Sequence, residues 1–82
     1  MKLPRDVSGQ QLAKLLGRYG YQVTRQTGSH IRLTSNIRNQ EHHVTIPNHD
    51  PLKVGTVGNI LNDVASYLEV AKPTLVERLF GE

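Results

Sequence analysis

Three short segments in the middle of the chain alternate between apolar and polar side chains, and this pattern constrains the fold more than any other feature. Tyr21–Gln26, His30–Thr34 and Glu41–Ile46 show the two-residue period of strands that bury one face. The first two are separated by a turn in which Gly28 can supply a positive φ, and the last two by a polar loop over residues 35–40. Consecutive strands with such short connections pair as an antiparallel meander. The sequence therefore predicts a three-stranded antiparallel sheet.

Helical patterns lie on both sides of these strands. Ser8 and Gln11 form a capping-box pattern at the start of a first helix, and Gly20 is placed to end it. After the strands, Thr56 is the expected N-cap of a longer helix whose apolar residues form one stripe over about four turns. The apolar positions at helical spacing are Leu12, Leu15, Leu16 and Tyr19 in the first helix and Val57, Ile60, Leu61, Val64, Ala65 and Leu68 in the second.

A short helical segment follows the long one. Pro73 interrupts the apolar stripe, and Thr74 with Glu77 forms a second capping-box pattern. The order predicts an α+β fold, α-β-β-β-α, with both helices on one face of the sheet and a short C-terminal helix, as a single domain over residues 1–82. The strand residues expected to face these helices are Tyr21, Val23, Ile31, Leu33, Val44 and Ile46.

The other face of the sheet is expected to stay in contact with solvent. By strand alternation it displays Gln22, Thr24, His30, Arg32, Thr34, His43 and Thr45. Histidine is the side chain best suited to proton transfer near neutral pH, and His30 follows the turn at Gly28 directly. Arg25 and Arg32 offer positive charge for a phosphate. The alternative is a surface histidine without a role.

Three other histidines and the start of the long helix are further candidates. His42 and His43 are adjacent in a strand and point to opposite faces, with His42 on the core side, so no metal site is predicted from them. His49 lies in the loop before the long helix and could reach the solvent-facing side of the sheet. Lys53 beside a helix N-terminus could seat a phosphate, although an ordinary helix start is the simpler interpretation.

The charge distribution favours an anionic partner. Ten Lys and Arg residues against seven Asp and Glu residues give a formal net charge of +3. Residues 14–38 contain cations and no acid, namely Lys14, Arg18, Arg25, Arg32 and Arg38. The absence of cysteine fits a reducing cytoplasm, and no apolar run suggests a signal peptide or a membrane span. No Walker motif, nucleophile elbow or pair of carboxylates supports NTPase, esterase or glycosidase chemistry.

Three runs of the chain carry motifs in a specific order. They are Arg25-Gln26-Thr27-Gly28-Ser29-His30, then His42-His43-Val44-Thr45-Ile46-Pro47-Asn48-His49, then Leu52-Lys53-Val54-Gly55-Thr56-Val57 with Ile60-Leu61. In this order they resemble the HicA (YcfA-like) family of toxin–antitoxin mRNA interferases. The resemblance implies a fold like the double-stranded-RNA-binding domain, cleavage of mRNA that depends on His30 without a metal or other cofactor, and a HicB-type antitoxin as partner in a type II system.

The expected mechanism uses the ribose 2′-OH as an internal nucleophile, which requires proton transfer and positive charge at the phosphate. His30 would act as base or acid, while His43 and His49 are both open as the second proton-transfer group. The residues expected to contact RNA are Arg25, Gln26, Gly28, Ser29, Arg32, His43, His49, Lys53 and Thr56. Two alternatives stay open: a non-catalytic RNA-binding module, and an interaction domain whose basic face binds an acidic partner.

Overall fold

The computed structural model describes residues 3 and 5–81 and has the predicted order of elements. The elements are α1 (Gly9–Leu16), a 3-10 turn η1 (Gly17–Tyr19), β1 (Gln22–Gln26), β2 (His30–Ser35), β3 (His42–Pro47), α2 (Val54–Leu68) and α3 (Lys72–Phe80). The strands form one antiparallel sheet in the order β1-β2-β3. The predicted α+β fold, with three antiparallel strands between helices and a short C-terminal helix, is confirmed.

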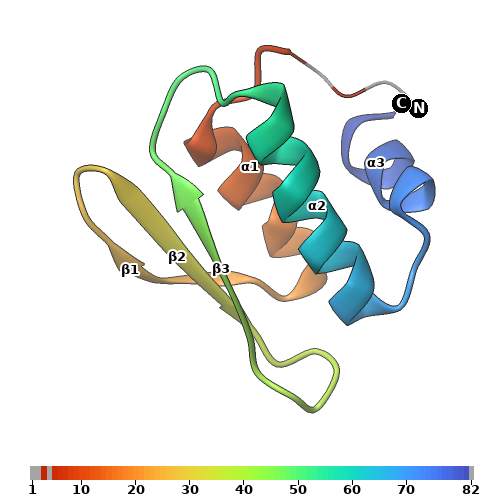
Figure 1. Cartoon of the computed structure of the whole chain (residues 1–82). Coiled ribbons are helices and arrows are strands. Elements are labelled where there is room, and N and C mark those ends of the chain that lie inside the picture. The colour runs from red at the N-terminus through yellow and green to blue at the C-terminus, as the bar shows by residue number, and fades with distance from the viewer. Residues whose placement is uncertain (1–2, 4, 82) are drawn as a thin grey trace.

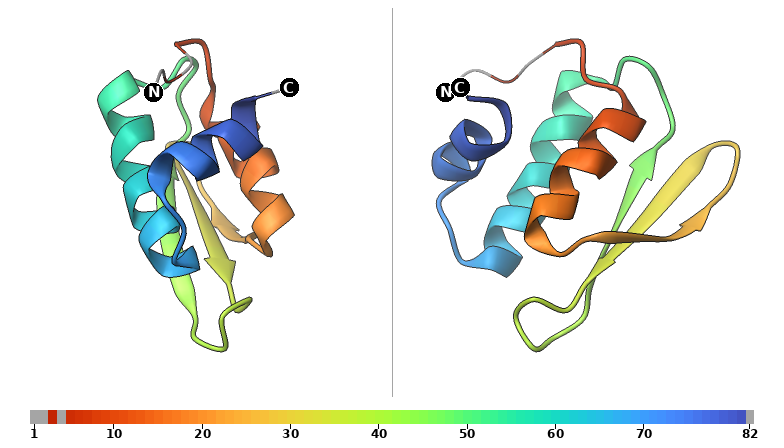
Figure 2. Two further views of the ribbon diagram at one scale, coloured as in Figure 1. Left: turned by 90° about the vertical axis from the view of Figure 1, so that its right-hand side faces the viewer. Right: turned by 180° about the vertical axis from the view of Figure 1, so that it is seen from behind.

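The elements are arranged in layers (Figures 1 and 2). α1 and α2 lie side by side on one face of the sheet, and α3 packs on these helices on the side away from the strands. The buried side chains form one hydrophobic cluster, in which Ile31 of β2, Leu61 of α2 and Leu75 of α3 are all fully inaccessible. The opposite face of the sheet carries no helix and is called the open face below. Within the described part of the chain, no helix combines the length and apolar character needed to cross a membrane.

The start of α1 has the predicted capping box. The Gln11 backbone N–H donates to Ser8 Oγ at 3.1 Å, and the Ser8 backbone N–H donates to Gln11 Oε1 at 2.9 Å. These two bonds satisfy backbone donors that the helix leaves free. Gly20 ends the helical segment with a φ of 80°, a left-handed conformation that glycine adopts without steric cost.

The predicted N-caps of the other two helices are wrong. α2 begins at Val54 after Lys53, so Thr56 lies inside its first turn, and α3 begins at Lys72 after Ala71, so Thr74 lies inside that helix. Pro73 occupies the first turn of α3. A proline is tolerated there because its missing N–H would have no partner in the helix, so it marks the start of α3 and not an interruption before it.

Val23 is the one predicted core position of the strands that is exposed. It pairs with the buried Leu33 and therefore faces the helix side of the sheet, but 51% of its surface is accessible. β1 is an edge strand, and α1 packs on β2 and β3, so no helix covers Val23. The other five predicted positions, Tyr21, Ile31, Leu33, Val44 and Ile46, are buried.

β3 ends one residue later than predicted, at Pro47, and α1 lies directly against this end. Pro47 pairs with His30 across the ladder, which an edge strand permits because one side of its backbone needs no partner. The Gly9 backbone N–H donates to the carbonyl oxygen of His49 at 2.9 Å. A Cβ atom at Gly9 would overlap the Pro47 carbonyl oxygen. Glycine at position 9 therefore permits the close approach of α1 to β3.

We expect Gly9→Ala to lower the free energy of unfolding by about 1–3 kcal/mol, because the new methyl group has to displace backbone atoms of β3. Urea denaturation measures this loss. Gly17→Ala is the matched control, since a Cβ atom there meets nothing within 4 Å and its φ of −56° suits alanine. Equal stability of the two variants would contradict the close packing at Gly9.

A polar network joins the sheet to α2 on the helix side. The Tyr21 hydroxyl lies 2.6 Å from His42 Nδ1, and His42 Nε2 lies 3.1 Å from Asp63 Oδ1. Because a carboxylate only accepts, His42 donates from Nε2 and accepts from Tyr21 at Nδ1. The His42 ring stacks on Tyr67 with centroids 4.6 Å apart, and the Tyr67 hydroxyl donates to the Gln40 carbonyl at 2.6 Å. The predicted core-side position of His42 is confirmed.

Because of this network, the stability of the fold decreases at alkaline pH. Burial, with smaller contributions from Tyr67 and Asp63, raises the pKa of Tyr21 above its ordinary value of 10.0. The unfolded chain loses this proton at the ordinary pKa, so the stabilisation is complete below pH 10.0 and is lost as the pH rises beyond it. Tyr21→Phe should remove this fall, whose slope is at most about 1.4 kcal/mol per pH unit, whereas Tyr19→Phe should retain it. Unfolding curves between neutral and strongly alkaline pH test the difference.

Candidate functional site on the open face

His30 begins β2 at one end of the open face, and its side chain is exposed. Ser29 Oγ lies 3.0 Å from His30 Nδ1. Within the described residues, Nε2 has no hydrogen-bond partner. The ring is therefore held through one nitrogen and presents the other to solvent, which is the arrangement that a proton-transfer group requires.

Thr27 organises the turn that precedes His30. Its backbone N–H donates to the His30 carbonyl at 2.9 Å, and its hydroxyl accepts from the backbone N–H groups of His30 at 3.1 Å and Ser29 at 3.3 Å. The expected positive φ at Gly28 is wrong: among the described glycines, Gly20 has a positive φ and Gly28 does not. A Cβ atom at Gly28 would meet nothing within 4 Å, so the surface beside His30 is open.

The loop after β3 is held beside this turn. The Asn48 backbone N–H donates to the Ser29 carbonyl at 2.9 Å, while the His49 carbonyl accepts from Gly9 of α1. Figure 1 shows the β1–β2 turn, the end of β3 and the start of α1 at the same end of the sheet. The exposed His49 follows two residues after Pro47, the cross-strand partner of His30. The structure thus brings His49 to the same end of the sheet as His30.

Arg25 and Arg32 lie directly opposite each other on β1 and β2. The ladder register shifts between Val23 and Arg25, so Thr24 is bulged out of the pairing and Arg25 pairs with Arg32. Both arginines are exposed, and neither belongs to the ion pairs of the described residues, which are Arg38–Glu69, His42–Asp63 and His43–Glu41. Like charges directly opposite each other destabilise a sheet, so an anion bound at this arginine pair would relieve the repulsion between the two guanidinium groups.

A row of polar side chains crosses the open face farther from His30. Thr24 Oγ1 lies 3.1 Å from Thr34 Oγ1, which lies 2.8 Å from His43 Nδ1. His43 Nε2 lies 3.0 Å from Glu41 Oε1. Thr34 is four residues from His30 along β2, about 13 Å at the rise of a strand. Strand alternation predicts these threonines on this face, but the sequence does not show their hydrogen bonds or the part played by Glu41.

Three of the predicted site residues lie away from the open face. Gln26 pairs with Ile31, whose side chain is buried under the helices, so Gln26 lies on the opposite side of β1 from Arg25. Lys53 and Thr56 lie at the start of α2. Among the described residues, no three His, Asp or Glu side chains come together as metal ligands.

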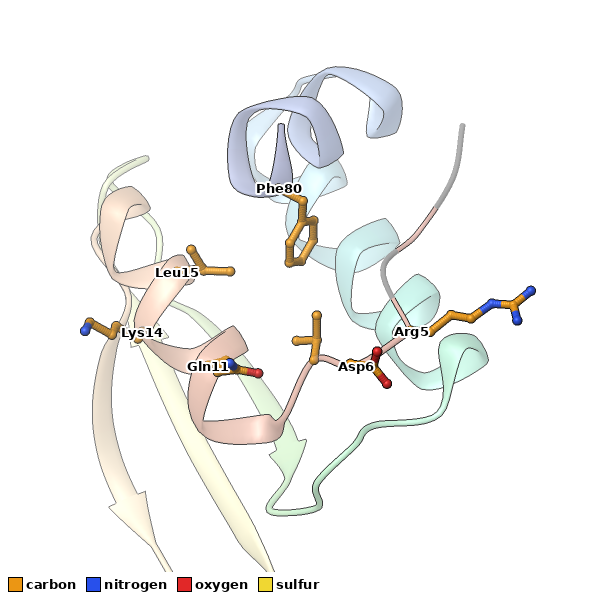
Figure 3. Close-up of a pocket in the computed structure, with 7 residues that line it drawn as sticks. Arg5, Asp6, Gln11, Lys14, Leu15 and Phe80 are labelled. Carbon is orange, nitrogen blue, oxygen red and sulfur yellow. The ribbon is translucent and has the colours of Figure 1, made fainter. Parts of the chain in front are cut away.

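A pocket of about 560 Å³ lies on the helical side of the molecule (Figure 3). It lies between α1, α3 and the segment before α1, and Val7, Lys14, Leu15 and Phe80 are among its lining residues. None of its lining residues is a histidine, and it is on the side of the sheet away from the open face. It is not part of the candidate site.

The fold and this face define a small α+β protein whose exposed imidazole and paired guanidinium groups suit a phosphate-containing ligand. The family model described as the HicA toxin of bacterial toxin–antitoxin systems matches residues 9–65, from α1 into α2. This match covers more than half of the chain, so the chain belongs to the HicA toxin family and is the toxin component of a toxin–antitoxin system. The family predicted from the sequence is confirmed. No curated protein and no solved structure matches the chain.

Proposed function

We propose that this protein is an endoribonuclease that cleaves mRNA in the cytoplasm, with His30 as its catalytic residue and with no metal or other cofactor. The main support is the His30 ring, which is exposed on the open face, bonded to Ser29 at Nδ1 and accessible at Nε2. Membership of the HicA toxin family gives the biological context. A HicB-type antitoxin is the proposed partner that suppresses the activity.

The chemistry needs no external nucleophile. The 2′-oxygen attacks the adjacent phosphorus, the bond to the 5′-oxygen breaks, and the products are a 2′,3′-cyclic phosphate and a 5′-hydroxyl end. One proton leaves the 2′-OH and one is delivered to the leaving 5′-oxygen. His30 Nε2 performs one of these transfers. The Ser29 hydroxyl at Nδ1 keeps the ring oriented for it.

The arginine pair supplies charge near the reacting phosphate. Arg32 is two residues from His30 on the same face of β2, about 7 Å between Cα positions. Guanidinium groups form strong, charge-assisted hydrogen bonds to phosphate oxygens. Their field also favours the additional negative charge that develops as the 2′-oxygen attacks.

His49 is the better candidate for the second proton-transfer group. His43 lies beside Thr34, about 13 Å along the sheet from His30, and a single phosphodiester does not span this distance. Both of its ring nitrogens are also engaged. His49 is exposed and belongs to the loop held against Ser29.

Two such proton-transfer groups give a bell-shaped dependence of kcat/KM on pH, and a profile with a single limb would contradict the assignment.

Incubation of the purified protein with single-stranded RNA in EDTA tests the proposed reaction. We expect cleavage under these conditions, and expression of the protein should arrest growth unless the antitoxin is produced with it. The alternative is a non-catalytic RNA-binding module, which the basic open face also supports. Binding of RNA without cleavage, together with growth that continues, would favour that alternative.

A further inference from the structure

The open face offers polar contacts well beyond the reach of one phosphodiester group. His30, Arg32 and Thr34 occupy alternate positions of β2 and share this face. They give three successive features along the strand: the imidazole, the arginine pair, and the row formed by Thr24, Thr34 and His43, called the threonine row below. The distance from the first to the last is about 13 Å.

Hydrogen bonds fix the orientation of the threonine row. His43 Nε2 lies 3.0 Å from Glu41 Oε1 at the end of the row. Thr34 Oγ1 lies 2.8 Å from His43 Nδ1 and 3.1 Å from Thr24 Oγ1, and the Thr24 hydroxyl donates to the Arg32 carbonyl oxygen at 3.4 Å. These contacts hold the side chains of the row in place before a ligand arrives, which lowers the entropy cost of binding.

The charges distinguish the threonine row from the arginine pair. A carboxylate ends the row at Glu41, so this position suits a neutral hydroxyl or base edge better than a phosphate. The arginine pair, without an ion-pair partner in the described part of the chain, suits a phosphate. A nucleic acid strand presents both kinds of group in alternation along its backbone.

We propose that the open face binds one single strand of RNA along β2, with the scissile phosphate at His30, a neighbouring phosphate at the arginine pair, and a ribose or base at the threonine row. The proposal rests on the proposed function, and it adds a second contact site and a minimum substrate length. His30, the arginine pair and the threonine row are together called the track below. Their side chains are hydroxyl, guanidinium and imidazole groups, so most contacts fall on the RNA backbone and sequence preference is weak. These contacts run from His30 along β2 toward the threonine row.

Binding of RNA oligonucleotides of two to eight nucleotides to the His30→Ala protein tests the track without cleavage. Affinity measured by fluorescence anisotropy should rise with length and level off once the strand reaches the threonine row. Thr34→Val, which replaces the hydroxyl by a methyl group of similar size, should weaken binding of the longer oligonucleotides by about 3- to 10-fold and leave the shortest ones unaffected. Thr24→Val, on the exposed edge strand, should act in the same direction.

The matched control is Thr74→Val, which removes an exposed hydroxyl on α3, on the far side of α1 and α2 from the open face. Three results would overturn the track. The first is an equal loss of affinity in this control, and the second is a loss that does not depend on oligonucleotide length. The third is an effect of Thr34→Val on binding of a protein antitoxin without an effect on binding of RNA. A different result would contradict the proposed cleavage alone. If the protein binds RNA with this length dependence but the wild type does not cut it, the track is supported and the catalytic role of His30 is contradicted.

Discussion

Replacing His30 with alanine should lower the rate of RNA cleavage by about 10²- to 10⁴-fold, the usual contribution of a general acid or base. The side chain is exposed, and its hydrogen bond in the described residues is to Ser29 Oγ. The turn itself is held by backbone groups and by Thr27, which the substitution leaves in place. Single-turnover cleavage of a labelled RNA by the purified variant measures the effect.

Stability and RNA affinity of the same variant are the controls. Its thermal unfolding should match that of the wild type, and its affinity for RNA should change little, because the phosphate contacts come from the arginine pair. His30→Gln, which retains hydrogen bonding without a titratable ring, should be as inactive as the alanine variant. Full cleavage by either variant would remove His30 from the mechanism, as would a loss of activity that follows unfolding.

Replacing both Arg25 and Arg32 with alanine should weaken RNA binding by about 10- to 100-fold at low salt, since hydrogen bonds to charged groups contribute about 1.5–3 kcal/mol. The dependence of affinity on salt should also become less steep. Each phosphate contact to a single strand contributes about 0.7 to the slope of log K against log salt concentration. Anisotropy titrations between low and physiological salt measure both quantities.

The fold should tolerate this double substitution. The two arginines oppose each other across the ladder, so their removal should leave the free energy of unfolding unchanged or raise it slightly. Lys14→Ala is the matched control, because Lys14 lies at the pocket between α1 and α3, on the helical side of the molecule (Figure 3). A similar loss of affinity in that control would show that RNA binding depends on net charge and not on the open face.

The sequence predicts the arrangement of elements well, because each signal is local. The capping box at Ser8 and the left-handed Gly20 depend on a few neighbouring residues, and both are confirmed. The alternation in β2 and β3 depends only on the pleat of a strand, and it correctly places Ile31 and Leu33 under the helices.

Features that depend on tertiary packing could not be predicted in this way. The exposure of Val23 follows from the edge position of β1 relative to α1, which no local pattern describes. The arginine pair depends on a bulge at Thr24, since strict alternation would place Arg25 on the side of the sheet opposite to Thr24. Likewise, the position of the His49 loop beside the turn of His30 depends on long-range backbone hydrogen bonds, from Asn48 to Ser29 and from Gly9 to His49.

The most direct test of the central proposal is the chemical identity of the product ends. An oligonucleotide with a single ribose among 2′-deoxy nucleotides, incubated with the protein in EDTA and analysed by mass spectrometry, shows both the position and the chemistry of cleavage. The proposed mechanism predicts a cut only after the ribose, with 2′,3′-cyclic phosphate and 5′-hydroxyl ends, and product formation about 10²- to 10⁴-fold slower in the His30→Ala variant. Cuts at deoxy positions, 3′-hydroxyl and 5′-phosphate ends, or equal products from the variant would contradict it.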